Sequence, residues 1–332
     1  MKEQTTPATI YDIAKLAGVN PSTVSRALTS PGRLNAKTEA KIRAAAKELN
    51  YRANPFARAL PTGRTKMIGL MIADITNPMF SNAVRGAEAM AMKYGYTLVI
   101  AESQESTIIE ASALEKIQAA VDGLIMVTTR LSDEQIREIN SQKPIVLMNR
   151  VVKGVEDVVP QNAPGIEEAI KHLASQGHKH IGFLSGPSNS WMSNERWKLL
   201  MKSALSHKMT IVEIGPNSPS IEGGKDALDR VIASGITAVV AYNDLMAIGL
   251  MRSAQERGYT IPADLSIIGF DNIFGSDFTS PPLTTIQMPL NEVGARAVES
   301  LLKSLGEEIE TGQYETLTTS LVTRESTEKA KG

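Results

Sequence analysis

The chain has 332 residues, of which 42% are hydrophobic, and it contains no cysteine. This length predicts two or three domains with a large core, and the composition excludes disulfides and thiolate chemistry. No apolar run approaches the length of a membrane span, and the first residues, "MKEQTTPATIYD", lack the apolar segment of a secretory signal. We therefore expect a cytoplasmic protein with no membrane partner.

The net charge of −1 is the sum of two opposite parts. Residues 1–66 contain 12 basic and 4 acidic side chains, a charge of +8, whereas the rest of the chain carries −9. A compact basic segment on an acidic body is typical of a nucleic-acid-binding head. A solvated basic tail is the alternative, but "IYDIAKLAGV" and "KIRAAAKELNY" have the apolar spacing of helices, which favours a folded head.

The first predicted helix begins after Thr9, whose hydroxyl can cap it. It ends at Gly18, because glycine adopts the left-handed conformation of a helix end most cheaply. Its apolar face is expected to contain Ile10, Ile13, Leu16 and Ala17. A second helix follows within two residues, with Asn20 as its cap and Pro21 at its first position, where a missing N–H costs nothing.

The second helix has two different faces. Val24 and Leu28 are four residues apart and are expected to point inward. The opposite face is polar and contains Ser22, Ser25, Arg26 and Thr29. An arginine there can form a bidentate contact with guanine, worth ~1–3 kcal/mol of discrimination between bases. Contact with phosphate or solvent is the alternative for Arg26.

A third helix, capped by Asn35, is predicted over "KTEAKIRAAAKEL", with Ile42, Ala45 and Leu49 closing a small core. Two helices joined by a tight glycine turn, the second with an exposed polar face, predict a helix-turn-helix whose second helix enters the major groove. The candidate DNA contacts in this head are Thr9, Pro21, Ser22, Thr23, Ser25, Arg26, Thr29 and Asn35.

The segment 54–66, "NPFARALPTGRTK", predicts a short helix that Pro61 and Gly63 stop. A helix of this length is marginal in water because nucleation is costly. We therefore expect this helix to form only when contacts outside the segment stabilise it.

Several segments, in order along the chain, resemble the lactose-repressor (LacI/GalR) family of bacterial transcription regulators. They are "TIYDIAKLAGVNPSTVSRAL", "ELNYRANPFARAL", "NPMF", "NDLMA" and "IIGFDN". The resemblance implies that residues 54–61 become a helix on operator DNA and that Leu60 from each of two subunits wedges into the minor groove. Arg58 and Leu60 are therefore candidate DNA contacts, with a plain linker as the alternative.

From Met67 onward, short apolar runs alternate with helical stretches such as "SNAVRGAEAMAMKYG" and "GIEEAIKHLASQG". The runs are "MIGLMIA", "TLVIA", "DGLIMV", "PIVLMN", "HIGFLS", "MTIVEI", "ITAVVAY" and "LSIIGF". This repetition predicts parallel sheets whose strands are buried on both faces. Four runs before residue 160 and four after it predict two similar lobes.

The predicted fold is an all-α helix-turn-helix head plus an α/β two-lobed core, which the resemblance implies to be periplasmic-binding-protein-like. The resemblance also implies that the chain crosses between the lobes near residues 161, 289 and 320. The expected domains are the head at 1–53, the hinge helix and linker at 54–66, and the effector-binding and dimerisation core at 67–332. Lobe 1 is expected at about 67–161 and 290–320, and lobe 2 at about 162–289 and 321–332.

Ligands of such sheets bind beyond the carboxyl ends of the strands, and the cleft between the lobes is the expected pocket. The polar residues just past the apolar runs are Asp74, Glu102, Thr128, Asn149, Ser185, Asn243 and Asp271. The resemblance independently points to Asn243, Asp271, Arg196 and Phe80. Carboxylate, amide and guanidinium groups bind hydroxyls, and Phe80 or Trp191 can cover the apolar face of a sugar ring. The candidate effector residues are Asp74, Phe80, Trp191, Arg196, Asn243 and Asp271.

Two of these residues have a structural alternative, since Asp271 can cap the turn that follows it and Trp191 can be ordinary packing. Other chemistries have less support. "EGGKD" around Lys225 lacks the spacing of a phosphate loop, and "HKH" at 178–180 has no third metal ligand nearby, which favours a structural role. No nucleophile and base form a recognisable set, so we expect no catalysis, no metal and no cofactor.

The sequence predicts a dimeric, ligand-controlled transcription regulator, expected to be a repressor, that binds a pseudopalindromic double-stranded operator. The rivals are an enzyme of sugar metabolism and an exported sugar-binding protein of the same two-lobed fold, and the basic head argues against both. The effector is expected to be a small hydroxylated molecule, a sugar or a nucleoside. The family usually has an acidic residue where this chain has Gln161, so a regulator that responds to a sugar phosphate, or a global carbon regulator, is the alternative.

Overall fold

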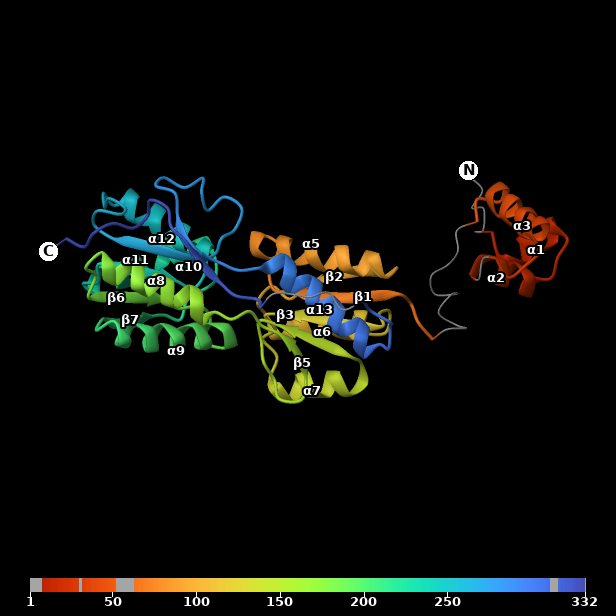
Figure 1. Ribbon diagram of the computed structural model, residues 1–332, viewed down its shortest axis with the longest axis horizontal. Helices are drawn as coiled ribbons and strands as arrows, with labels where there is room; N and C mark the ends of the chain where they lie inside the picture. The colour runs from red at the N-terminus through yellow and green to blue at the C-terminus, as the bar shows by residue number, and fades with distance from the viewer. Residues whose placement is uncertain (1–7, 30–31, 52–62, 311–315, 332) are drawn as a thin grey trace. The chain divides into compact units, whose positions relative to one another are not determined.

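The computed structural model describes residues 8–29, 32–51, 63–310 and 316–331. The chain forms two compact units, residues 1–66 and 67–332 (Figure 1). The predicted hinge at 54–61, with Arg58 and Leu60, lies outside the described residues. Across the described residues, no helix is both long and apolar enough to cross a bilayer.

The head contains three helices, α1 (Ile10–Ala17), α2 (Pro21–Thr29) and α3 (Ala36–Glu48). Thr9 caps α1 as predicted: its hydroxyl accepts from the backbone N–H of Asp12, and the Asp12 carboxylate accepts from the N–H of Thr9 at 2.8 Å. Gly18 ends the helix with φ +67°, the left-handed conformation predicted for it. Thr9 therefore sets where α1 begins, and Gly18 sets where the tight turn of the helix-turn-helix lies.

The core of the head confirms most of the predicted apolar positions. Ile13, Val24 and Ile42, one from each helix, are fully buried. Leu16 was expected on this face and is instead 47% exposed. The buried stripe of α1 is centred on Ile13, Ala14 and Ala17, and Leu16 lies about a quarter of a turn outside it.

Lobe 1 of the core is built around one parallel sheet. Its elements are β1 (Met67–Ile72), α5 (Pro78–Lys93), β2 (Thr97–Glu102), α6 (Thr107–Ile117), β3 (Gly123–Val127), α7 (Asp133–Gln142), β4 (Ile145–Met148), β5 (Glu156–Val158) and α13 (Leu290–Ser304). The strand order is β2-β1-β3-β4-β5. Every residue of β3 and β4 is buried, because helices cover both faces of the sheet.

Lobe 2 repeats this arrangement. Its elements are α8 (Ala163–Ser175), β6 (His180–Leu184), α9 (Trp191–Ser206), β7 (Thr210–Ile214), α10 (Ile221–Asp226), α11 (Leu228–Ala233), β8 (Ala238–Ala241), α12 (Asp244–Glu256), β9 (Ser266–Asp271), β10 (Thr284–Gln287) and β11 (Ser320–Val322). The order is β11-β10-β9-β8-β6-β7, with β11 antiparallel to β10. Strands β6 to β10 therefore have the same spatial order as β1 to β5.

Helix α13 returns late in the chain to pack on α5, β3, β4 and β5 of lobe 1; Figure 1 shows α5 and α13 side by side. Two glycines allow these helices to approach closely. A Cβ on Gly86 would lie 1.9 Å from the carbonyl oxygen of Asn291, and one on Gly294 would lie 2.0 Å from that of Ala83. The sequence places glycine where two helix backbones touch.

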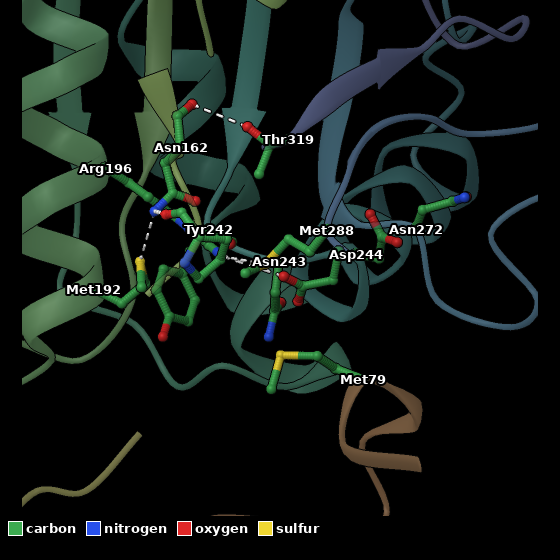
Figure 2. A network of polar contacts seen from close by, with 12 residues as sticks. Met79, Asn162, Met192, Arg196, Tyr242, Asn243, Asp244, Asn272, Met288 and Thr319 are labelled. Atoms are coloured by element: carbon green, nitrogen blue, oxygen red, sulfur yellow. Dashed lines mark hydrogen bonds and ion pairs between the residues drawn. The ribbon is translucent and has the colours of Figure 1, made fainter. Parts of the chain in front are cut away.

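The crossings between the lobes are bonded to one another. The Gln161 N–H donates to the Leu317 carbonyl at 2.7 Å, and the Thr319 N–H donates to the Gln161 carbonyl at 3.1 Å. The Thr319 hydroxyl also donates to the Asn162 carbonyl at 3.2 Å, a contact drawn in Figure 2. A third crossing runs from Met288 into α13, which begins at Leu290.

Candidate functional site

The candidate ligand site is a cleft between the two lobes, near the crossings. Residues from both lobes line it: Asn77, Met79, Phe80, Glu105, Thr128, Arg130, Asn149, Met192, Arg196, Pro219, Tyr242, Asn243 and Asp271. Its free volume is about 20 Å³, which is room for about one water molecule. A sugar-sized ligand therefore enters only if side chains or lobes move apart.

Arg196 is the central cation of the cleft and projects from the second turn of α9. Its guanidinium donates to the Tyr242 carbonyl, to Asp271 Oδ1 at 3.2 Å and to the sulfur of Met288 at 3.3 Å. It also stacks on the Phe270 ring, with Cζ 3.5 Å from the ring centroid. Figure 2 shows Arg196, Tyr242, Asn243 and Asp244 grouped together, with Met79 approaching from lobe 1. Guanidinium groups stack and donate in this way while remaining charged.

Two carboxyl groups are buried here: Asp271, which pairs with Arg196, and Asp244, whose pKa Asp271 affects. Burial raises the pKa of Asp271 to about 6, although Arg196 acts in the opposite direction. Burial, and then the neighbouring Asp271, raises the pKa of Asp244 to about 8. Asp244 accepts from the Thr285 hydroxyl at 2.6 Å and from the Ile273 N–H at 2.8 Å. At neutral pH Asp244 is therefore mainly protonated, and the charge opposite Arg196 comes from Asp271.

The lobe 1 side of the cleft carries its own ion pair. Arg130, whose side chain is 3% exposed, lies 2.7 Å from Glu105, and its Nη1 donates to the Thr128 carbonyl at 3.0 Å. Burial lowers the pKa of Arg130, but the Tyr242 hydroxyl and Glu105 raise it more. Tyr242 belongs to lobe 2 and lines the same cleft, so Arg130 lies where the two lobes meet.

Backbone strain is concentrated where strands end at the cleft. Thr128, Asn149 and Asp271 follow or end β3, β4 and β9 with φ values of +54°, +58° and +105°. Such conformations cost about 1–3 kcal/mol each and occur at ligand sites more than elsewhere. A β-branched threonine is especially unfavourable there.

Three buried polar atoms of this cleft have no hydrogen-bond partner among the described residues. They are Thr128 Oγ1, Asn149 Oδ1 and Arg196 Nε. Buried polar groups are normally bonded, because leaving one unpaired costs about 1–3 kcal/mol. One acceptor, one donor and a hydroxyl that can do either are suited to the hydroxyl groups of a small ligand.

The structure brings together four of the six predicted effector residues: Phe80, Arg196, Asn243 and Asp271 all line the cleft. Asn243 also caps α12, since its Oδ1 accepts from the Met246 N–H and its Nδ2 donates to the Pro219 carbonyl, both at 2.9 Å.

The other two predicted effector residues lie outside the cleft lining. Asp74 Oδ1 accepts from the N–H and hydroxyl of Thr76, which makes it part of a local turn. Trp191 is the first residue of α9 and packs against the hydrophobic core. Both residues therefore have a structural role in this arrangement.

Sequence reasoning missed several lining residues. Glu105, Arg130 and Tyr242 were not among the candidates, nor were the two methionines of the lining, Met79 and Met192. Arg130 and Tyr242 lie within three residues of the ends of β3 and β8, so considering all of the first three residues after each strand would have found them.

In the head, the structure places the predicted DNA contacts at defined positions. Ser22 and Arg26 are exposed one turn apart on α2, and Thr23 and Ser25 are half-buried. Pro21 and Thr29 are the first and last residues of α2. Thr9 and Asn35 cap α1 and α3, and Asn35 Oδ1 accepts from the Lys37 N–H at 2.9 Å. Ser22 and Arg26 therefore form the accessible part of the predicted reading face.

The histidines of "HKH" have protein partners, which fits the predicted structural role. His178 contacts the Thr237 hydroxyl at 2.8 Å and the Glu328 carbonyl at 3.0 Å. His180 contacts the Thr210 hydroxyl at 2.6 Å. Both rings thus join β6 to neighbouring segments.

A helix-turn-helix head on a two-lobed α/β body with a polar cleft defines a class of ligand-controlled DNA-binding regulators. Residues 9–54 match the family described as bacterial regulatory proteins, lacI family, and residues 170–327 match the periplasmic binding protein-like domain. The HTH-type transcriptional repressor CytR of Escherichia coli (strain K12) is 33% identical over 317 residues, which are 92% of each chain. The ribose operon repressor of Halalkalibacterium halodurans is 33% identical over 325 residues, covering 96% of this chain and 97% of the relative.

Solved structures agree with this assignment. The lac repressor dimer bound to operator and the anti-inducer ONPF superposes with a TM-score of 0.84 and 28% identity, covering 97% of this chain and all of that one. A LacI family transcriptional regulator from Enterococcus faecium with bound ribose has a TM-score of 0.70 and 29% identity, covering 80% of this chain and all of that one. The chain belongs to the LacI family of bacterial transcription regulators.

Proposed function

We propose that this chain represses transcription as a homodimer that binds operator DNA through its head and a small effector between its lobes. The head supplies the charge, +8 over residues 1–66, and an exposed Arg26 and Ser22 on α2. The relatives are named as repressors, and one similar structure is a dimer on its operator. A dimer of such heads reads a pseudopalindromic site.

The effector is a hydroxylated small molecule held by Arg196, Asp271, Asn243 and Phe80. One observation supports this assignment: Thr128 Oγ1, Asn149 Oδ1 and Arg196 Nε line the cleft and are buried without a hydrogen-bond partner in the described part of the chain. Two similar regulators were solved with bound ribose, at 29% and 28% identity, which supports a sugar or a nucleoside.

Dimerisation would place a second copy against exposed apolar surface of the core. Phe274 and Phe278 follow β9, are 78% and 69% exposed, and contact each other edge to face at 5.1 Å between ring centroids. Paired exposed aromatics are typical of interface cores. The family consists of transcription regulators, and we propose that this member likewise works without catalysis, in the cytoplasm where its DNA lies.

DNA binding is tested with fragments selected from a random pool and measured by fluorescence anisotropy. Arg26→Gln should lower the preference for the selected site by ~10–100-fold. Arg137→Gln, a matched change on α7 where Arg137 pairs with Glu134, should have no effect. Equal loss of preference in both variants would refute the assignment of α2 as the reading helix.

The division of labour is tested by removing residues 1–62. The truncated core should lose DNA binding and retain its effector, whereas the full chain should show log affinity falling linearly with log salt, at about −0.9 per phosphate neutralised. Retention of operator by the truncated core at physiological salt would contradict the proposal. Leu60→Ala should reduce DNA bending while nonspecific binding persists, as measured by circular-permutation gel shifts.

A further inference from the structure

A second and larger pocket, the chamber, lies beside the cleft. None of the sequence motifs described above assigns it a function. Its volume is about 670 Å³, and it shares Arg130 with the cleft. Its polar lining consists of Thr107, Arg130, Ser132, Gln135, Arg150 and, from lobe 2, Asn189. The chamber is open to solvent, so this volume is an upper limit on the space that would hold a ligand.

The lining is cationic. It contains two guanidinium groups and, as far as the structure describes the chain, no carboxylate. The Arg130 and Arg150 side chains pair with Glu105 and Asp133, both at 2.7 Å. The Arg130 backbone N–H also donates to the buried Glu110 carboxylate at 3.0 Å. Glu105 and Asp133 are 27% and 47% exposed, whereas the two arginine side chains are 3% and 12% exposed. Water therefore screens these two acids more than the cations that line the chamber.

Arg150 has an N–H donor without an acceptor among the described residues. Its Nη2 donates to Asp133 Oδ1 and, at 3.4 Å, to the Leu131 carbonyl. Its Nε is buried and has no hydrogen-bond partner within the described part of the chain. A buried guanidinium N–H without an acceptor costs free energy that an anionic oxygen would recover.

Two helices begin at the same chamber and add to its positive potential. Thr107 is the first residue of α6, and Ser132 caps α7. The N-terminal end of each helix carries the positive end of the helix dipole and unbonded N–H groups. The acids in these first turns, Glu110, Asp133 and Glu134, reduce this potential, so the arginines are its main source.

We propose that the Arg130–Arg150 chamber binds a phosphate monoester, so that the effector of this regulator is a phosphorylated sugar or nucleoside with its hydroxylated ring in the cleft and its phosphate in the chamber. Arginine is suited to this because its planar fork matches phosphate oxygens. The inference rests on the proposed effector cleft. The hydroxyl groups of a neutral sugar can accept from these donors, but they carry no charge to neutralise the two guanidinium groups.

Isothermal calorimetry on the full chain tests the proposal with three probes: ribose, ribose 5-phosphate and inorganic phosphate. The wild-type protein should bind ribose 5-phosphate at least ~10-fold more tightly than ribose, the gain expected from one charge-assisted hydrogen bond. In Arg150→Gln the ratio of the two dissociation constants should approach one. Arg257→Gln, in lobe 2 and outside the chamber, removes an arginine that pairs with the exposed Asp229 and should keep the wild-type ratio.

Inorganic phosphate separates this proposal from the proposed function. Saturable phosphate binding that Arg150→Gln removes supports the chamber even if neither sugar binds, in which case only the effector cleft is wrong. Phosphate binding that is absent, or that Arg150→Gln leaves intact, overturns the chamber whether or not ribose binds. Unchanged operator affinity shows that a variant is folded. If Arg150→Gln does not fold, Arg150→Lys replaces it with the same expected outcomes, because lysine keeps the charge but lacks Nε.

Discussion

The ion pair between Arg196 and Asp271 allows a quantitative prediction. The two side chains are 3% and 2% exposed and 3.2 Å apart. Breaking a buried pair by removing one partner costs about 3–5 kcal/mol, because the other charge stays buried without compensation. Arg196→Met should lower the free energy of unfolding of lobe 2 by roughly this amount at neutral pH. Asp271→Asn should cost less, because burial already favours the neutral form of this side chain.

The double variant should be far less damaged than the sum of the single ones. It has neither charge, so its cost is mainly lost hydrogen bonds, about 1–2 kcal/mol. The coupling energy between the two sites should therefore exceed ~2 kcal/mol. Urea unfolding followed by tryptophan fluorescence measures it, because the chain's two tryptophans, Trp191 and Trp197, both lie on α9 in lobe 2. If the stability lost in the double variant equalled the sum of the losses in the two single variants, the charges of the pair would contribute nothing to stability.

The same variants have a pH signature. Asp271 has a pKa of about 6 in the folded protein against an ordinary value of 3.8, so the folded state binds its proton more tightly than the unfolded chain. Its contribution to stability is full below about pH 4 and is lost as the pH rises through about 6. Arg196→Met removes the group that lowers this pKa, so the loss should extend to higher pH. The destabilisation should grow above pH 6 by up to ~1.4 kcal/mol per pH unit, and a cost independent of pH would refute the reasoning.

Three further predictions concern other sites. Thr9→Ala removes the capping hydroxyl of α1 and should cost the head about 1 kcal/mol, seen as faster hydrogen exchange in α1. Gly86→Ala puts a methyl group 1.9 Å from the Asn291 carbonyl and should destabilise lobe 1 by about 1–3 kcal/mol in thermal unfolding, with Ser81→Ala on the same helix as the unaffected control. Asp244, with its pKa raised to about 8, loses its stabilising contribution as the pH rises through about 8. Asp244→Asn should therefore remove a decline of roughly 1–2 kcal/mol between pH 7 and 9, and an unchanged decline would contradict the assignment.

Elements with a strong local signal could be predicted from the sequence. The cap at Thr9, the turn at Gly18 and the eight apolar runs depend on neighbouring residues alone, and each predicted run contains a strand. Three strands were missed: β5, β10 and β11. Two of them have three residues, and β10 has the sequence "TTIQ", so none has the apolar run that identifies a buried strand. These segments become strands because they pair with a neighbouring strand that is distant in sequence or better defined, and the local sequence does not reveal that pairing.

The cleft was predictable only in part for the same reason. Polar residues next to strand ends, such as Asn243 and Asp271, follow from parallel-sheet topology. The pairing of Arg130 with Glu105, and the approach of Tyr242 from the other lobe, depend on how the loops fold back and how the lobes close. Asp74 shows the converse, since it follows a strand but turns into a local hydrogen bond with Thr76. Sequence position predicts which residues lie at the edge of the sheet. Competing hydrogen bonds within the protein determine which of these side chains remain available to a ligand.

The contacts of Arg196 indicate how an effector can act on the whole core. Its guanidinium bonds to Asp271 and to Met288, and Met288 lies in the crossing that leads into α13, which packs on lobe 1. A ligand that needs more than the present free volume of about 20 Å³ has to move side chains or lobes apart, and one that binds Arg196 can exchange these bonds for its own. It shifts the balance between two lobe arrangements only by its difference in affinity for them. Exchanging one or two charge-assisted hydrogen bonds, at about 1.5–3 kcal/mol each, is enough for the ~1–3 kcal/mol that couples ligand and DNA sites in allosteric proteins. The signal can therefore originate in the rearrangement of one arginine at the point where the lobes are joined.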